Sequence, residues 1–421
     1  MRRALMGLVV LAVCGMMMIP VVLIDKQVGI AAAEEPTGTI PLDDSKLQLA
    51  ITSDDYLRLY DWDSATGQFT HEWSGTGAGK MIGGCALGDL DNDGSKELAG
   101  FRVYSQIVSK KQTINTYYLD IWDTGAASDK PTYSTTISSV AANGAMKIGN
   151  VDSDSGNELV LKTGWDDIEI WDFSYDANKK ITSETNKYTS KISKAGDYGF
   201  TVANCDSDSV MEIVVGSAYD DDGVYNGKAV VIDYQSGSYV RAAYLGYRGV
   251  DDVSVGDLDG DATNGNEIFM SGAMSGDTGM KVCIWRYNGN GYGEVWSGEY
   301  ELCPAFDYLQ SNEIADIDGD GNNEAIAGTE AWNERVKGKV VWYYRLFVWV
   351  YDGVDDTWIK SSHDVSHCGG QVDALVSADL DGDDNHDAEL VFNGAVLDWD
   401  YANHCLETIQ SLPYGKTNYI G

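Results

Sequence analysis

The chain has 421 residues, of which 66 are Asp or Glu and 29 are Lys or Arg, so its formal net charge is −37. Because nucleic acids bind to faces rich in Lys and Arg, this balance argues against a nucleic-acid partner. The 47 glycines, the 6 prolines and the frequent short alternating runs of Tyr, Val, Ile and Trp predict an all-β protein with glycine-rich turns.

The N-terminal residues 1–33 are predicted to be a signal peptide or an N-terminal anchor. Arg2 and Arg3 form a short basic region, residues 4–24 are apolar, and residues 31–33 are small alanines at which a signal peptidase could cut. If it is not cleaved, the apolar run is long enough to span a bilayer. In both cases we expect the remainder to be secreted or at the cell surface, with residues 34–41 as a linker.

Six short acidic stretches follow along the chain, and residues 316–324 (DIDGDGNNE) show their pattern most fully. The pattern D-x-D-x-D-G-x-x-E places oxygen-bearing side chains at positions 1, 3, 5 and 9 of a tight loop, and a backbone carbonyl near position 7 adds a further oxygen. Gly321 stands where the chain must turn sharply. Carboxylates this close repel one another unless a cation lies between them, and an all-oxygen shell without His or Cys suits Ca²⁺.

Up to six Ca²⁺ sites are therefore predicted. Their ligands are Asp89, Asp91, Asp93 and Glu97; Asn150, Asp152, Asp154 and Glu158; Asn204, Asp206, Asp208 and Glu212; Asp257, Asp259, Asp261 and Glu267; Asp316, Asp318, Asp320 and Glu324; and Asp379, Asp381, Asp383 and Glu389. Two loops begin with Asn, and in two others a two-residue insertion moves the final Glu further along the chain, to Glu267 and Glu389. Six ions would still leave a net charge of about −25 from the −37 of the chain.

The first residues of these loops are 61, 54, 53, 59 and 63 residues apart, a spacing that indicates a repeat architecture. In each repeat an apolar strand precedes the loop, and an apolar, an aromatic and a more polar strand follow it. The aromatic strand recurs seven times, at 56–62, 118–122, 168–171, 229–233, 281–285, 346–349 and 396–399. The first repeat lacks the acidic triplet.

Four antiparallel strands cannot bury both faces of their own sheet, but radial stacking of such sheets covers those faces. The sequence therefore predicts a seven-bladed β-propeller of four-stranded antiparallel blades over residues 42–421. Closure of the ring requires the first blade to pack on the last. We expect either the tail, residues 413–421, or residues 36–41 to supply the innermost strand of the first blade.

The lead-in strand, the D-x-D-x-D-G-x-x-E loop and the apolar strand after it resemble FG-GAP/VCBS repeats, as in the N-terminal propeller of integrin α chains. The resemblance covers residues 42–411 and implies a propeller with calcium in the loop between the first two strands of a blade. The Phe-Gly and Gly-Ala-Pro signatures of integrin repeats are not intact, so a prokaryotic-type relative is nearer.

No catalytic motif is recognisable, since G-x-S-x-G, H-E-x-x-H and a phosphate-binding glycine loop are all missing from the sequence. We expect a non-catalytic binding or adhesion module whose ligand is an extracellular protein or glycan, with membrane contact only through an uncleaved N-terminal segment. Two alternatives stay open: a carbohydrate-active enzyme similar to propeller polysaccharide lyases, and a structural subunit of a surface assembly. Six cysteines outside the N-terminal segment make one or more disulfides plausible.

Overall fold

The computed structural model describes residues 38–421 with gaps. The gaps are 54, 78, 110–111, 141–143, 165–166, 193–194, 207, 218–227, 247–248, 262–264, 274–278, 302–308, 330–331, 337–338, 353–356, 368–374, 381–387, 393–394, 401–404, 413–418 and 421. The predicted signal or anchor segment and the first part of the linker lie outside the described residues.

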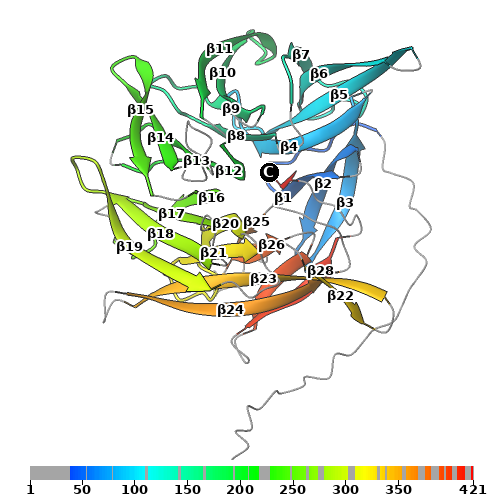
Figure 1. Cartoon of the computed structure of the whole chain (residues 1–421). Helices are drawn as coiled ribbons and strands as arrows, with labels where there is room; N and C mark the ends of the chain where they lie inside the picture. Colours follow the sequence, from blue (N-terminus) through cyan, green and yellow to red (C-terminus); the bar gives the residue numbers. More distant parts are fainter. Residues whose placement is uncertain are drawn as a thin grey trace, which may run out of the picture. The chain divides into compact units, whose positions relative to one another are not determined.

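The described residues form seven antiparallel sheets, one for each predicted repeat (Figure 1). Blade 1 comprises β29 (Tyr419–Ile420), β1 (Gln48–Ser53), β2 (Tyr56–Asp63) and β3 (Gln68–Gly75). Blade 2 comprises β4 (Lys80–Gly88), β5 (Glu97–Ser109), β6 (Gln112–Trp122) and β7 (Tyr133–Ile137). Blade 3 comprises β8 (Ala145–Gly149), β9 (Glu158–Lys162), β10 (Asp167–Tyr175) and β11 (Ile181–Lys191). Blade 4 comprises β12 (Ala195–Ala203), β13 (Glu212–Ser217), β14 (Ala229–Gln235) and β15 (Ser238–Leu245).

The remaining three sheets continue this order. Blade 5 comprises β16 (Asp252–Gly256), β17 (Glu267–Ala273), β18 (Gly279–Tyr287) and β19 (Tyr292–Glu301). Blade 6 comprises β20 (Leu309–Ala315), β21 (Glu324–Thr329), β22 (Trp332–Val336), β23 (Lys339–Asp352) and β24 (Thr357–His367). Blade 7 comprises β25 (Leu375–Ala378), β26 (Glu389–Phe392), β27 (Ala395–Asp400) and β28 (Cys405–Ser411). The prediction of a seven-bladed propeller is confirmed, and blade 6 differs from the four-strand prediction by its additional strand β22.

The hydrophobic core consists of seven clusters, and each cluster joins two consecutive blades. The cluster of Leu49, Ile51 and Trp62 with Val391 and Leu412 joins blade 1 to blade 7. A sheet that is apolar on both faces buries them only between neighbours, so the seven clusters account for the ring. The repeated aromatic residue of the third strand lies in these clusters; Trp122 and Trp349, for example, are fully buried.

The ring is closed by the C-terminal tail. Strand β29 pairs with β1 through Ile420 opposite Ile51 and Tyr419 opposite Thr52, and so becomes the innermost strand of blade 1. Of the two expected closures, the tail is the one observed (Figure 1, near the C-terminus). The outer strands of the same two blades are joined by Gln410, whose side chain donates to Phe69 O at 2.9 Å and accepts from Phe69 N–H at 2.7 Å.

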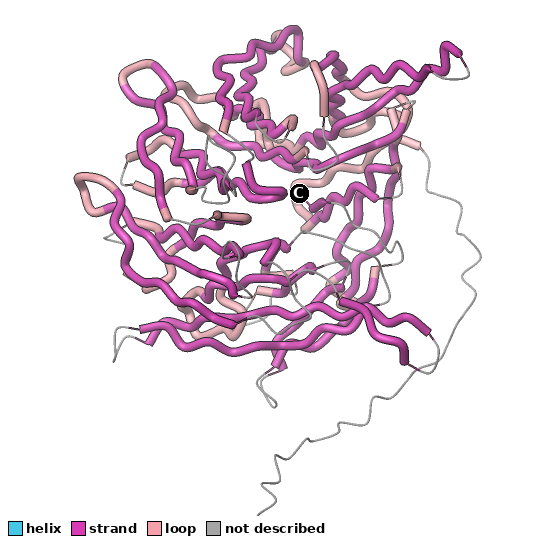
Figure 2. The backbone as a smooth tube through the Cα atoms, in the orientation of Figure 1, coloured by secondary structure: helices cyan, strands magenta, loops and turns pink. Residues whose placement is uncertain are grey.

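Two hairpins are longer than the blades that carry them (Figure 2). In blade 2, β5 and β6 pair from Leu98–Trp122 out to Ser109–Gln112, and the last six residues of β5 are exposed. In blade 6, β22 pairs with the first half of β23. The chain between β21 and the main part of β23 therefore contains a hairpin strand of its own.

The described part of the chain contains no helix that is long and apolar enough to cross a membrane. Cys85, Cys205, Cys283 and Cys405 form no disulfide, and the first three are buried in strands or beside them. Cys303 and Cys368, the other two of the six cysteines, lie outside the described residues.

Candidate metal centres in the acidic loops

Each acidic loop connects the first and the second strand of its blade, as predicted; residues 89–96, for example, link β4 to β5. The first strands of all blades line the centre of the ring and lie beside one another, as contacts between β4 and β8, β12 and β16, and β16 and β20 show. The six loops consequently lie at the same end of the propeller, together with the turns between third and fourth strands.

The closing Glu of each loop is buried and held in the same way. One of its carboxylate oxygens, Oε2, accepts a hydrogen bond from the backbone N–H of the second loop residue. The pairs are Leu90 to Glu97 at 2.8 Å, Val151 to Glu158 at 2.9 Å, Cys205 to Glu212 at 2.6 Å, Leu258 to Glu267 at 2.9 Å, Ile317 to Glu324 at 3.0 Å and Leu380 to Glu389 at 2.7 Å. The two-residue insertions before Glu267 and Glu389 therefore leave these glutamates in the position that the shorter loops use.

The second oxygen of this Glu identifies what the loops could hold. Oε1 of Glu158, Glu212 and Glu324 is buried and has no hydrogen-bond partner, although these side chains are at most 1 % exposed. An unpartnered buried carboxylate oxygen is costly. Ligand atoms of Asp152 and Asp154 lie within 4.8 Å of one another and of Glu158, and the same holds for Asp89 and Asp91 with Glu97. These oxygen sets fit a hard divalent cation such as Ca²⁺.

Burial and repulsion between neighbouring carboxylates raise the pKa values of several acidic groups in the loops. Burial and, to a lesser extent, the nearby Asp318 and Asp316 carboxylates raise the pKa of Glu324 to about 8, against the hydrogen bond from Ile317. The pKa of Glu158 is raised to about 8 and that of Glu267 to about 7, with burial again the main cause. The pKa of Asp91 is raised by burial and by Asp93. A cation among the carboxylates would favour their ionised forms.

The first position of the loop explains why Asn can replace Asp. The two carboxylate oxygens of Asp89 accept from the N–H groups of Asp93 and Gly94 at 3.0 and 2.9 Å. In the Asn-led loop of blade 3, Asn150 Nδ2 instead donates to Asp154 O at 2.9 Å, and the buried Oδ1 atom has no partner. Asn204 Nδ2 donates to Asp208 O in the same manner. The amide thus closes the loop and still presents one oxygen.

The fifth position is less uniform than predicted. Asp154 Oδ1 and Asp93 Oδ1 each accept a hydrogen bond from the N–H two residues on, but Asp154 belongs to the close group of its loop and Asp93 lies outside that of Asp89, Asp91 and Glu97. Asp320 Oδ1 likewise accepts from Asn322 N–H at 2.8 Å. Asp381 and Asp383 lie outside the described residues. The turn glycines behave as expected, since Gly94 and Gly321 have φ values of 92° and 90°.

In blades 4 and 5 a charged residue on the third strand lies opposite the closing Glu and next to the other carboxylates of the loop. In blade 4 this residue is Asp233, whose carboxylate lies within 4.8 Å of those of Asp206 and Glu212. In blade 5 it is Arg286, which is paired with Glu267 across the sheet. Arg286 Nη1 lies 2.6 Å from Asp259 Oδ2, and its Nε lies 3.5 Å from Glu267 Oε1. The guanidinium of Arg286 therefore supplies a positive charge to the blade 5 loop, which the loop motif did not predict.

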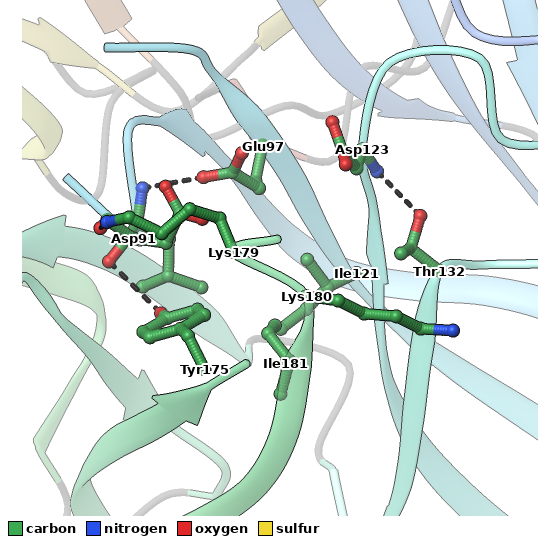
Figure 3. Close-up of a pocket in the computed structure, with 10 residues that line it drawn as sticks. Asp91, Glu97, Ile121, Asp123, Thr132, Tyr175, Lys179, Lys180 and Ile181 are labelled. Atoms are coloured by element: carbon green, nitrogen blue, oxygen red, sulfur yellow. Dashed lines mark hydrogen bonds between the residues drawn. The ribbon is translucent and has the colours of Figure 1, made fainter. Parts of the chain in front are cut away.

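The loop of blade 2 is covered by two side chains from blade 3 (Figure 3). Tyr175, at the end of β10, donates to Leu90 O at 3.2 Å, and Lys179 Nζ donates to Asp91 O at 2.9 Å. Lys179 has a φ of 64°, which places it in the turn between the third and fourth strands. Side chains of blade 3 therefore hold the acidic loop of blade 2 in place, which the loop motif alone could not predict.

Blade 1 has replaced the site by an internal ion pair. Gln48 stands where the other blades have the closing Glu, and its Nε2 donates to Asp61 Oδ1 at 2.8 Å and to Pro41 O at 3.0 Å. Lys46 Nζ lies 2.5 Å from Asp61 Oδ2. This agrees with the predicted loss of the acidic triplet in the first repeat.

Comparisons with known proteins bear on the fold. No family model and no curated protein matches the chain. A protein from Lactobacillus plantarum of known structure superposes with a TM-score of 0.52 at 11 % identity, covering 89 % of this chain and 98 % of that one. The exotype rhamnogalacturonan lyase YesX gives a TM-score of 0.43 at 15 % identity over 90 % and 65 %, and Chaetomium thermophilum Sqt1 gives 0.46 at 11 % over 77 % and 71 %. At 11 % identity the likeness to the Lactobacillus plantarum protein concerns the fold alone, and the FG-GAP/VCBS resemblance remains a prediction.

Proposed function

We propose that the protein is an extracytoplasmic, calcium-stabilised propeller that binds a protein or glycan ligand and catalyses no reaction. The buried, unpartnered Oε1 atoms of Glu158 and Glu212, each among two further carboxylates within 4.8 Å, carry the calcium part of this proposal. Free calcium outside the cytoplasm is high enough to fill sites of modest affinity, which suits the predicted N-terminal targeting segment.

A surface cleft supports the binding part of the proposal. It has a volume of about 500 Å³ and lies between the acidic loops of blades 2 and 3. Its lining includes Asn92, Asn157, Phe173, Tyr175 and Lys179. Amide and charged groups at the rim of this cleft suit a polar ligand such as a sugar, which exchanges hydrogen bonds with them.

Thermal unfolding with and without a chelator tests the calcium part. A cation that binds only the folded protein stabilises it by RT ln(1 + [L]/Kd), about 2.7 kcal/mol per site at a hundredfold excess over Kd. We expect the melting temperature to fall markedly in EDTA and to return when Ca²⁺ is restored. An unchanged melting curve would show that the loops do not depend on a cation.

The binding part is tested with the secreted form on glycan and protein arrays, in Ca²⁺ and in EDTA. We expect retention of a specific glycan or protein only in Ca²⁺, without release of products from a panel of polysaccharides. Product release that persists in purified protein would overturn the non-catalytic assignment.

A further inference from the structure

One contact recurs between every pair of successive acidic loops. The residue immediately before the closing Glu donates a hydrogen bond to the backbone carbonyl of the first residue in the preceding loop. The pairs are Asn157 Nδ2 to Asp89 O at 2.5 Å, Met211 N to Asn150 O at 3.0 Å, Asn266 Nδ2 to Asn204 O at 2.8 Å, Asn323 Nδ2 to Asp257 O at 2.6 Å and Ala388 N to Asp316 O at 2.6 Å.

The chain of contacts also extends to blade 1. Lys96, which precedes Glu97, donates through its backbone N–H to Asp44 Oδ1 at 2.8 Å and through Nζ to Lys46 O at 3.0 Å. A second contact reinforces the first link, because Asn92 Nδ2 donates to Ser155 O at 2.8 Å. The loops of blades 1 to 7 are therefore joined in sequence, from each blade to the next, by hydrogen bonds outside the sheets.

The two ends of each contact belong to the candidate metal sites. The acceptor is the carbonyl of position 1, whose side chain is a predicted ligand. The donor stands at the position before the closing Glu, between that ligand and the carbonyl near position 7. A cation that orders one loop therefore also fixes the group that holds position 1 of its neighbour. Ordering one loop lowers the entropy that the next loop must lose when it binds an ion.

We propose that these inter-loop hydrogen bonds make cation binding positively cooperative around the propeller, so that the six acidic loops become ordered together over a narrow range of free Ca²⁺ concentration. This inference rests on the proposed calcium function and adds its regulation. Electrostatics alone predicts the opposite sign, because a loaded loop is less negative than an empty one and attracts the next ion less. Positive cooperativity would therefore have to come from the inter-loop hydrogen bonds.

The test is a calcium-binding isotherm of the full chain, measured by competition with a chromophoric chelator. The variant carries Asn157→Ala, Asn266→Ala and Asn323→Ala together, which removes the three side-chain links. The control is Asn290→Ala, an exposed asparagine in the turn between β18 and β19 that lies outside the acidic loops. We expect a Hill coefficient of about 2 for the natural chain and the control, and about 1 for the triple variant, with the number of bound ions unchanged.

A second measurement uses a single substitution, so that the test does not depend on the folding of the triple variant. Asn323→Ala removes only the link from the blade 6 loop to the blade 5 loop, and we expect it to lower the Hill coefficient partway, while Asn290→Ala leaves it unchanged. A Hill coefficient of 1 in the natural chain, or one that Asn323→Ala and the triple variant leave unchanged, would overturn the inference while the calcium function stands. A chain that binds no ion would overturn both.

Discussion

Arg286 Nη1 lies 2.6 Å from Asp259 Oδ2, so that a guanidinium stands beside the third residue of the blade 5 loop. Burial raises the pKa of Glu267 to about 7, and the positive charge of Arg286 opposes this rise. At this third-strand position blade 4 has an acid, Asp233. The six loops are thus unequal, and we expect the blade 5 loop to bind Ca²⁺ most weakly because its carboxylates already have a positive partner.

Replacing this arginine should strengthen the weakest site. In Arg286→Gln the carboxylates of Asp259 and Glu267 lose their internal cation, and we expect the affinity of one site to rise about tenfold, which corresponds to about 1.4 kcal/mol. The isotherm of the full chain measures it. Arg335→Gln, at an exposed arginine of β22, serves as the control and should change nothing. An unchanged weakest site in Arg286→Gln would contradict the role of Arg286.

Removing one central ligand should remove one ion. Asp318 is a predicted ligand that raises the pKa of the buried Glu324 beside it. We expect Asp318→Ala to bind one Ca²⁺ fewer than the natural chain by titration and to melt at a lower temperature. The control Asp63→Ala affects only a turn of blade 1, where Asp63 accepts from Ala65 N–H at 3.0 Å. The ligand assignment is wrong if both variants bind as many ions as the natural chain.

Asp252 should make the stability depend on pH. Burial raises its pKa from 3.8 to about 7; Glu313 acts in the same direction, whereas Lys147 and the N–H groups of Val253 and Asn312 oppose it. Between these two values the folded state binds more protons than the unfolded state. The contribution of Asp252 to the free energy of unfolding is therefore greatest below pH 3.8 and is lost as the pH rises through about 7.

The size of the change in the free energy of unfolding follows from the shift in the pKa of Asp252. Between pH 5 and pH 8 the group should lower the free energy of unfolding by about 2–3 kcal/mol, at about 1.4 kcal/mol per pKa unit. Denaturant unfolding in saturating Ca²⁺ measures this for the natural chain and for Asp252→Asn, whose side chain cannot ionise. We expect a smaller fall in the variant. Parallel pH profiles would show that Asp252 does not titrate in this range.

Ring closure by the tail can be tested by truncation. Deleting residues 419–421 removes β29 from the inner edge of β1, and we expect a loss of about 1–2 kcal/mol, the value of one or two backbone hydrogen bonds. Deleting Gly421 alone is the matched control, because it leaves Tyr419 and Ile420 paired with β1. Equal unfolding free energies for the two truncated chains would show that β29 does not close the ring.

Much of the fold could be predicted because the same strand and loop pattern recurs once in each blade. The aromatic third strand, with buried Trp122 in blade 2 and Trp349 in blade 6, counts the blades directly. Strand β22 was missed because residues 332–336 pair with the extension of a long third strand, and no pattern of their own predicts that extension.

The candidate sites could be predicted only as far as the loop motif reaches. Glu97 and Glu324 follow from their spacing after the acidic triplet. Arg286 and Asp233 act across a sheet, so their contribution depends on strand register, which the motif does not contain. Asn157 reaches a carbonyl 68 residues earlier in the chain, and only the packing of two blades brings the two groups together.

Metal analysis of the purified protein tests the central claim most directly. The full chain is equilibrated in millimolar Ca²⁺, desalted and examined by native mass spectrometry and elemental analysis. The six acidic loops predict about five to six bound Ca²⁺ ions per chain, with the blade 5 loop the first to be emptied on dilution. Less than one bound ion per chain under these conditions would contradict the assignment of the loops as cation sites.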